Sequence, residues 1–372
     1  MQILKIECYT FLVPFKFVFR HASATRSETE NFLVRVSTTT GTVGFGEGCP
    51  RYYVTGETIN SCRRFITEYQ ESFRAEVNCV NSLFQWIKDH DELIDANPSA
   101  FSALEVATLD VLGKHTSMPT EKLLGIAQEN FTLNYSAIIG NSSSSTYHSL
   151  AKKYLSHGFT DFKIKLSGIV QDDQDKLEVW TQKSLTNSIK VRLDANNYWS
   201  NARECIAYLK QLPAVFWAIE EPLRPRDFEG MFEVSEVLQT KIILDESCIT
   251  TEDLRSLSGN QWLCNVRVSK HGGIYRALEL IAEIKKKKFE FILGAHVGET
   301  SLLSRATVLL TQSVQNSQRA LEGAFGTHLL SHDLTDPEIK FNDRGLIELR
   351  DLQCLSQPGF GMEVKADLLR QL

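Results

Sequence analysis

The most constraining feature of the sequence is a repeat, after Gly125, of short β-branched runs that are each followed by a helical pattern. The runs occupy residues 134–139, 161–166, 189–194, 215–220, 241–245, 262–268 and 290–295. Such alternation predicts parallel strands joined by helices. Ionisable side chains spaced 25 to 29 residues apart close five of the runs, namely Lys165, Asp194, Glu220, Asp245 and Lys270. The strand ends of a (β/α)8 barrel converge on one mouth, so the pattern favours a TIM-type barrel over an open sheet.

The first third of the chain has a different sequence pattern. It combines strand-like alternation at 2–11, 31–37 and 42–47 with helical spacing at 59–90 and 99–114. We therefore expect an α+β domain over residues 1–125 and a barrel over residues 126–340. The eighth barrel strand is expected near 319–324, and the C-terminal segment, 341–372, is expected to pack back on the first domain.

Three successive runs end in carboxylates, those of Asp194, Glu220 and Asp245. Because parallel strands deliver their ends to one side of the barrel mouth, these groups should meet. Three hard oxygen ligands suit Mg²⁺ or Mn²⁺ and leave positions open for water or substrate. A single aspartate at a strand end would more often cap a helix, but three in register predict a metal site.

Lysines accompany the carboxylates. Lys163 and Lys165 flank Ile164, so both should face the barrel interior. Burial and a neighbouring cation lower the pKa of a lysine, which would prepare Lys165 to act as a neutral base. Lys270 lies four strands further round and should approach from the opposite side. Two bases flanking one carbon, with a metal to hold developing negative charge, predict removal and delivery of a proton next to a carboxylate.

These residues form an ordered series of motifs: Lys163-Ile-Lys165, Asp194-Ala-Asn196, Ile219-Glu-Glu-Pro222, Leu244-Asp-Glu-Ser247 and Lys270-His-Gly-Gly-Ile274. The series resembles that of the enolase superfamily, muconate-lactonizing-enzyme subgroup, within the mandelate racemase/muconate lactonizing enzyme family. Further segments look like this family's capping domain and tail: Gly44-Phe-Gly-Glu47, Val54-Thr-Gly-Glu57, Ala103-Leu-Glu-Val-Ala107 with Asp110, and Pro358-Gly-Phe-Gly361. The resemblance covers most of the chain. It implies a TIM-type (β/α)7β barrel with an N-terminal α+β capping domain that the C-terminal tail completes.

The resemblance also implies a role for each motif residue. The three carboxylates would bind Mg²⁺ or Mn²⁺, and the acid/base catalysts would be Lys165 and Lys270. Lys163 would tune Lys165 and touch the substrate carboxylate. Asn196 and Glu221 would orient the ligands, or would simply cap loops.

The implied activity is that of an isomerase: a racemase or epimerase of amino-acid or dipeptide derivatives, or a muconate-type cycloisomerase. Lyases of the same superfamily, such as o-succinylbenzoate synthases and acid-sugar dehydratases, are alternatives. A non-catalytic binding protein on the same barrel is another. An unrelated lyase with Lys270 as a Schiff-base nucleophile would explain one lysine, but neither the second nor the carboxylates.

In proteins that the chain resembles, loops of the first domain close over the barrel and read the distal end of the substrate. The candidate loops here are 19–26 and 51–55. The candidate substrate contacts in and near such loops are Arg26, Arg51, Thr55, His296 and Glu299. The two arginines could each bind a second carboxylate in bidentate fashion. His296 and Glu299, after the seventh run, are expected to line the site as polar groups.

Three details bear on the subgroup. The His-x-Asp base typical of mandelate racemases is absent. The sequence at residues 54–57 is similar to that of dipeptide epimerases, but residues 322–327 lack the Asp-x-Asp that those enzymes share. That region and the Glu220-Glu221 pair look more like the cycloisomerase version, so both readings stay open.

Composition excludes several classes of protein. With 40 basic and 46 acidic residues, the net charge of −6 does not provide the basic surface that nucleic-acid binding needs. No stretch approaches the roughly 20 apolar residues of a membrane span, and because the first residues alternate and carry charge we expect no signal sequence. Eight scattered cysteines are expected to be thiols. We expect a cytoplasmic homo-oligomer that acts on a small-molecule carboxylate.

Overall fold

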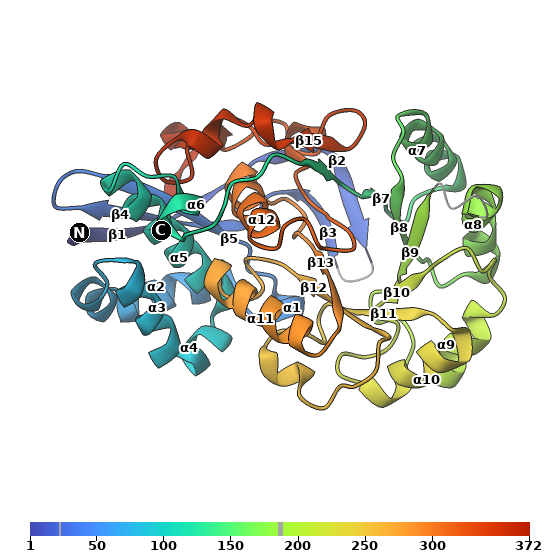
Figure 1. The fold of residues 1–372 in the computed structure, drawn as a ribbon. Coiled ribbons are helices and arrows are strands. Elements are labelled where there is room, and N and C mark those ends of the chain that lie inside the picture. The colour runs from blue at the N-terminus through green and yellow to red at the C-terminus, as the bar shows by residue number, and fades with distance from the viewer. Residues whose placement is uncertain (22–23, 185–188) are drawn as a thin grey trace.

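The β-branched runs form one parallel sheet in this computed structural model, which describes residues 1–21, 24–184 and 189–372. Strands that follow one another in the chain are also neighbours in the sheet, from β7 to β13. The sheet curls into a barrel wall with helices outside it (Figure 1). Its strands are β7 (Ala137–Ile139), β8 (Asp161–Lys165), β9 (Lys190–Asp194), β10 (Ala218–Glu220), β11 (Lys241–Leu244), β12 (Trp262–Val266) and β13 (Glu290–Leu293).

The expected helices follow all but one of these strands. They are α7 (Ser144–Ser156), α8 (Val170–Ser184), α9 (Ala202–Leu209), α10 (Phe228–Leu238), α11 (Ile274–Lys286) and α12 (Ser301–Ser313). The exception follows β11, where the chain forms only a 3-10 turn, Thr251–Leu254. That turn has a capping box between Thr250 and Asp253, which satisfies its free backbone N–H groups without a longer helix.

The eighth barrel position is filled by residues 319–324, as expected, but not by a regular strand. Leu321 forms a single parallel bridge with Leu293 of β13. On the other side, Ser136 N donates a hydrogen bond to Leu321 O at 2.8 Å, so this segment links the two ends of the sheet. Gly323 and Ala324 have φ values of 103° and 49°, and such left-handed backbone ends an extended segment.

The first domain is built on an antiparallel sheet of order β17-β1-β4-β5. Its elements are β1 (Ile3–Phe11), β4 (Asn31–Thr38), β5 (Val43–Gly48), a hairpin of β2 (Pro14–His21) and β3 (Ala24–Glu28), and helices α1 (Tyr52–Thr55), α2 (Ile59–Glu76), α3 (Val80–Asp89), α4 (Asp91–Asp95), α5 (Pro98–His115) and α6 (Thr120–Leu123). The helical spacing at 59–90 therefore belongs to two helices. They are separated at Val77, whose backbone is extended.

Glycines on β5 allow α5 to lie unusually close to the sheet. A Cβ atom on Gly44, Gly46 or Gly48 would stand 2.1–2.3 Å from a backbone oxygen of α5. Their alternation along the strand places all three on the face that meets the helix. Side chains at these positions would push α5 away from the sheet.

The C-terminal segment returns to the first domain. Its last strand, β17 (Arg370–Gln371), pairs with β1, and Phe360 N donates to Asp110 Oδ1 of α5 at 2.9 Å. Both chain ends lie on the capping side of the molecule (Figure 1). Before that, β15 (Leu346–Glu348) pairs with β6 (Thr132–Asn134), and β14 (Thr335–Asp336) pairs with β16 (Glu363–Val364). The division of the chain at residues 125 and 340 stays a prediction.

None of the helices in the described part of the chain has the length and apolar character that crossing a membrane requires.

Candidate active site

The three carboxylates predicted as metal ligands lie at adjacent strand ends. Asp194 is the register partner of Glu220, and Glu220 is the partner of Ile243, two residues before Asp245. All three are buried, at 2%, 1% and 4% exposure. Parallel pairing in this register therefore brings them into one row along the barrel mouth.

Lys163 and Lys165 lie at one end of this row. Lys165 Nζ donates to Asp194 Oδ2 at 3.0 Å and to Asn196 Oδ1 at 2.9 Å. Lys163 Nζ lies 2.8 Å from Glu220 Oε2 and 3.3 Å from Asp194 Oδ2. As the alternation predicted, the two ammonium groups share the inner face of β8.

Lys270 lies at the other end of the row. Its Nζ donates to Asp245 Oδ1 at 2.9 Å, to Asp245 O at 2.7 Å and to Asn265 O at 2.7 Å. Three strands, β9 to β11, separate β8 from β12 in the sheet, so Lys165 and Lys270 approach the carboxylates from opposite sides.

Four further polar residues belong to this cluster, and none of them was predicted as a site residue. Arg267 pairs with Asp245, and Asn265 Nδ2 donates to Glu220 Oε1 at 3.0 Å. Arg192 Nη2 lies 2.7 Å from Glu322 Oε1, which in turn is 3.3 Å from Lys163 Nζ. The alternation of inward positions could have found Arg192, which precedes Asp194 by two residues. Glu322 lies in the segment expected to form the eighth strand, but this segment is not a regular strand, so alternation does not predict which way its side chain points.

Asn196 and Glu221 hold the row in place. The Glu221 carboxylate accepts hydrogen bonds from Asp245 N at 2.6 Å, Ser247 N at 2.7 Å and Ser247 Oγ at 2.8 Å. Asn196 N donates to Asp194 Oδ1 at 3.1 Å. Both residues have positive φ, 48° for Asn196 and 41° for Glu221, which is costly for non-glycine residues and is common at functional sites.

Burial and charge pairing act in opposite directions on the pKa values of the cluster. Burial would raise the pKa of Asp194, but Lys163 and Lys165 outweigh it, and the pKa lies below its ordinary value. Burial would lower the pKa of Lys163, yet Asp194, Glu220 and Glu322 raise it. Burial raises the pKa of Glu220 to about 7 despite Lys163. Lys163 is thus a firmly held cation, suited to binding an anion rather than to accepting a proton.

The carboxylate row suits Mg²⁺ by donor chemistry, since it offers three buried carboxylates from adjacent strand ends. Glu220 Oε2 accepts no well-directed hydrogen bond, although Lys163 Nζ lies nearby. Among the described residues, no three His, Cys, Asp or Glu side chains converge closely enough to enclose a metal. Each carboxylate is instead drawn towards a lysine or arginine, so metal binding requires these cations to move aside.

The candidate substrate contacts on the two loops of the first domain, Arg26, Arg51 and Thr55, form contacts within the protein. Arg51 is 1% exposed and donates to Glu30 O, Pro50 O, Val297 O and Asn31 Oδ1. Arg26 pairs with Glu30 and lies over the Tyr53 ring. Thr55 Oγ1 donates to Glu57 Oε2 at 2.8 Å. That these residues contact the substrate stays a prediction. Residues 22–23 of the loop 19–26 lie outside the described residues.

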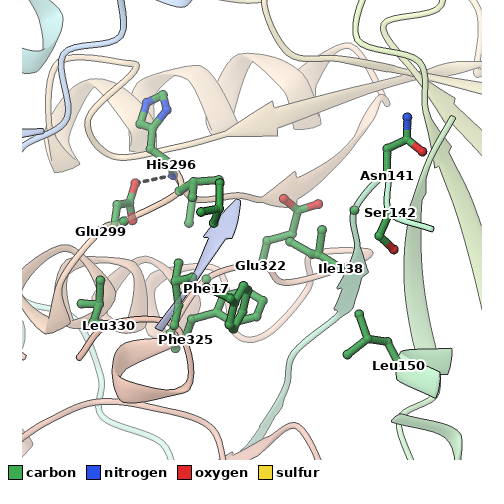
Figure 2. A pocket seen from close by; sticks show the side chains of 18 of the residues that line it. Phe17, Ile138, Asn141, Ser142, Leu150, His296, Glu299, Glu322, Phe325 and Leu330 are labelled. Atoms are coloured by element: carbon green, nitrogen blue, oxygen red, sulfur yellow. Dashed lines mark hydrogen bonds between the residues drawn. The ribbon is translucent and has the colours of Figure 1, made fainter. Parts of the chain in front are cut away.

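His296 and Glu299, in contrast, line a cavity of about 460 Å³ beside the carboxylate row. Its other walls come from β2, the segment 140–143, α7 and the segments 322–325 and 329–330. Glu322 belongs to the cavity wall and also contacts Lys163, which connects the cavity to the row. Figure 2 shows Phe17, Phe325 and Leu330 on one side of the cavity and Glu322 and His296 on the other.

Glu299 gives this region a pH dependence. Burial raises its pKa to about 8, although its carboxylate accepts a hydrogen bond from His296 N. The folded state therefore keeps a proton that the unfolded chain loses near the ordinary pKa of 4.5. Consequently the free energy of unfolding falls as the pH rises from 4.5 to about 8, and this contribution is constant outside that window.

We expect Glu299→Gln to weaken this pH dependence. At about 1.4 kcal/mol per unit of pKa difference, the change amounts to at most a few kcal/mol between pH 5 and pH 8. Urea unfolding at both pH values measures it. The matched control is Glu252→Gln, because the Glu252 side chain is 62% exposed. If the free energy of unfolding fell equally between pH 5 and pH 8 in the wild type and in Glu299→Gln, Glu299 would not be the source of this pH dependence.

Fold and site together define a class: a capped β/α barrel with lysines on either side of a carboxylate row. Residues 5–125 match the N-terminal domain of the mandelate racemase/muconate lactonizing enzyme family. Residues 146–368 match the enolase C-terminal domain-like family. The chain therefore belongs to the mandelate racemase/muconate lactonizing enzyme family of the enolase superfamily, as the motifs predicted.

Similar proteins are known from several bacteria. A protein of Enterococcus faecalis described as a hydrophobic dipeptide epimerase is 27% identical over 332 residues, which cover 88% of this chain and 92% of that protein. An N-succinyl-L-Arg/Lys racemase of Bacillus cereus is 25% identical over 382 residues, covering 100% and 98% of the two chains. The crystal structure of a dipeptide epimerase from Enterococcus faecalis, complexed with Mg and L-Leu-L-Tyr, has a TM-score of 0.80 at 22% identity and covers 98% of this chain and 100% of that one.

Proposed function

We propose that the protein is a metal-dependent racemase or epimerase that moves the proton on the carbon next to a substrate carboxylate. The observation that carries this proposal is the placement of Lys165 and Lys270 at opposite ends of the carboxylate row. Inversion at a carbon needs one group that removes the proton from one face and another that delivers a proton to the other face. The E. faecalis epimerase and the B. cereus racemase carry names of the same reaction class, which supports it.

The residues of the row have separate tasks in this reaction. Asp194, Glu220 and Asp245 would hold Mg²⁺, which is present in the E. faecalis crystal structure. When bound, Mg²⁺ supplies positive charge that favours loss of a proton next to a carboxylate. Lys163 offers its ammonium group to the substrate carboxylate.

The two flanking lysines move the proton. Lys165 Nζ, when neutral, accepts the proton from one face of the α carbon, and the Lys270 ammonium group donates a proton to the other face. The same steps in reverse act on the opposite enantiomer. Glu221 keeps the end of β11 in register, so that Asp245 and Lys270 stay aligned on the reacting carbon.

A cycloisomerase or a lyase of the same superfamily is the second candidate. It would use the same carboxylates and one of the two lysines, because proton transfer to a single face is sufficient. The resemblance of residues 322–327 to the cycloisomerase version, without Asp-x-Asp, favours this candidate.

Solvent exchange separates the candidates. The protein is incubated with Mg²⁺ in ²H₂O with a library of chiral carboxylates, and products are followed by mass spectrometry and chiral chromatography. We expect deuterium at the α carbon together with inverted configuration. Loss of water, or ring closure without inversion, would replace the proposal by the second candidate. Binding without any exchange would indicate a non-catalytic protein.

A further inference from the structure

We propose that the cavity beside Lys163 receives an uncharged, largely apolar substituent of the substrate. The substrate class is then an α-substituted carboxylate, such as an acylated amino acid, whose second group is neither an ammonium nor a carboxylate. This inference rests on the proposed function, since it places the reacting carboxylate at the row of Asp194, Glu220 and Asp245.

One wall of the cavity is apolar. Phe17 and Val18 of β2, which are among the most exposed large hydrophobic residues of the chain, lie on its rim at 57% and 49% exposure. Phe325 and Leu330 complete this wall, and Leu150 of α7 adds an apolar side chain from the side of Ser142 (Figure 2). A volume of about 460 Å³ is within the range of small-molecule sites. Covering Phe17 and Val18 with an apolar group would remove hydrocarbon from water, which favours binding.

The Glu322 carboxylate in the opposite wall is already compensated. Arg192 Nη2 lies 2.7 Å from its Oε1, and Lys163 Nζ lies 3.3 Å from the same atom. Both cations are buried with it, at 0% and 5% side-chain exposure. A substrate ammonium group at this place would meet two fixed cations, so Glu322 is not a free anion for it.

The other titratable groups in the wall are neutral. Glu299 is protonated near pH 7 because burial raises its pKa to about 8. Burial lowers the pKa of His296 well below its ordinary value, with Arg267 as the next cause. Among the described lining residues there is no lysine or arginine, so a second carboxylate finds no partner there.

Two neutral polar atoms of the lining lack partners. Ser142 Oγ and His296 Nε2 are buried, and neither has a hydrogen-bond partner within the described part of the protein. The His296 ring points away from the other labelled lining residues (Figure 2), so Ser142 Oγ is the atom of the two that a ligand in the cavity would meet. Buried polar atoms normally have one. An uncharged polar group of a ligand, such as an amide carbonyl, would satisfy Ser142, whereas a purely ionic group would find its counter-charges already used.

Three amides of L-alanine that share one chain length test this inference: N-pentanoyl, N-succinyl and N-(4-aminobutanoyl). Their distal ends are uncharged, anionic and cationic. With Mg²⁺ present, calorimetry gives the Kd of each, and α-deuterium exchange gives kcat/KM. We expect the pentanoyl compound to be preferred at least tenfold over both others in each measurement.

The outcomes separate the inference from the proposed function. Preferred binding of the pentanoyl compound without exchange would leave the inference standing and contradict the proposed function. Exchange with equal or better use of a charged compound would contradict the inference alone. Absence of binding by all three compounds would also overturn the inference.

A charge-introducing variant sharpens the test. Leu150→Lys adds a cation to the lining of the cavity on the side of α7. We expect it to shift the ratio of Kd values by at least tenfold towards the succinyl compound. Ser149→Lys adds the same charge to an exposed neighbouring position of α7 and should leave the ratio unchanged. An unchanged ratio in Leu150→Lys, in a variant with wild-type thermal stability, would place the distal group elsewhere.

Discussion

Replacement of Lys165 or Lys270 by methionine is expected to lower the rate of inversion at the α carbon by about 10³-fold, within the range typical of lost acid–base catalysis. Methionine keeps much of the length of lysine but has no proton to exchange. Each variant lacks one group, which accepts the proton in one direction of the reaction and donates a proton in the reverse direction. Chiral chromatography of both enantiomers, run separately, measures the effect.

The two variants should differ in what they retain. With one base left, α-deuterium exchange on a single enantiomer can persist without inversion, and the favoured enantiomer should be opposite in Lys165→Met and Lys270→Met. Lys190→Met removes a lysine from the exposed start of β9 and serves as the control. Wild-type inversion in either active-site variant would overturn the assignment of that lysine.

Folding must be checked for Lys270 in particular. Its side chain is fully buried and donates three hydrogen bonds, so its loss leaves Asp245 without one of its two cations. Leaving a buried charge uncompensated is destabilising. Lys270→Arg keeps the charge. A folded, inactive arginine variant would show that activity depends on the lysine itself and not on the charge.

The second large effect concerns the metal. We expect Mg²⁺ to raise the thermal stability of the wild type and the neutralising variants Asp194→Asn, Glu220→Gln and Asp245→Asn to lose most of this gain. At a metal concentration 100 times its Kd, binding adds about 2.7 kcal/mol to the free energy of unfolding. A variant with hundredfold weaker affinity would gain only about 0.4 kcal/mol under the same conditions. Thermal unfolding with and without Mg²⁺ measures the difference, and Mn²⁺ can be compared in the same way.

The control for this experiment lies in the same barrel. Asp161 is buried and pairs with Arg192, at the opposite end of β8 from Lys165. Asp161→Asn thus removes a buried negative charge without touching the row, and its response to Mg²⁺ should equal that of the wild type. Undiminished stabilisation by Mg²⁺ in all three row variants would place the metal elsewhere.

The sequence was sufficient to predict the row for two reasons. Side chains in a strand alternate between its two faces every two residues, and the strand–helix unit of the barrel recurs about every 25 residues. These two periods place Lys163 and Lys165 on one face and Asp194, Glu220 and Asp245 at one mouth. Both periods are local properties of the backbone. They can be read without knowing how distant segments pack.

The contacts between distant segments were beyond such reasoning. Arg51 was expected to bind a substrate carboxylate, and that role stays a prediction. Its hydrogen bonds to Val297 O and Asn31 Oδ1, at the junction of cap and barrel, were not predicted. Glu322 lies in the segment expected as the eighth strand, which is irregular in the structure, and its contacts with Arg192 and Lys163 were not predicted. Which partners a long charged side chain contacts depends on how distant segments of the chain pack together.

By itself, the sequence determined the barrel, the family and the order of acidic and basic groups around its mouth, because hydrophobic periodicity and motif spacing record the local backbone. Only the tertiary structure decided which charges are free. In the cavity, burial neutralises Glu299 and pairing compensates Glu322, so two acidic residues line a wall that presents no net charge to a ligand. Burial and ion pairing arise only when distant segments meet, and so no local pattern in the chain can specify them.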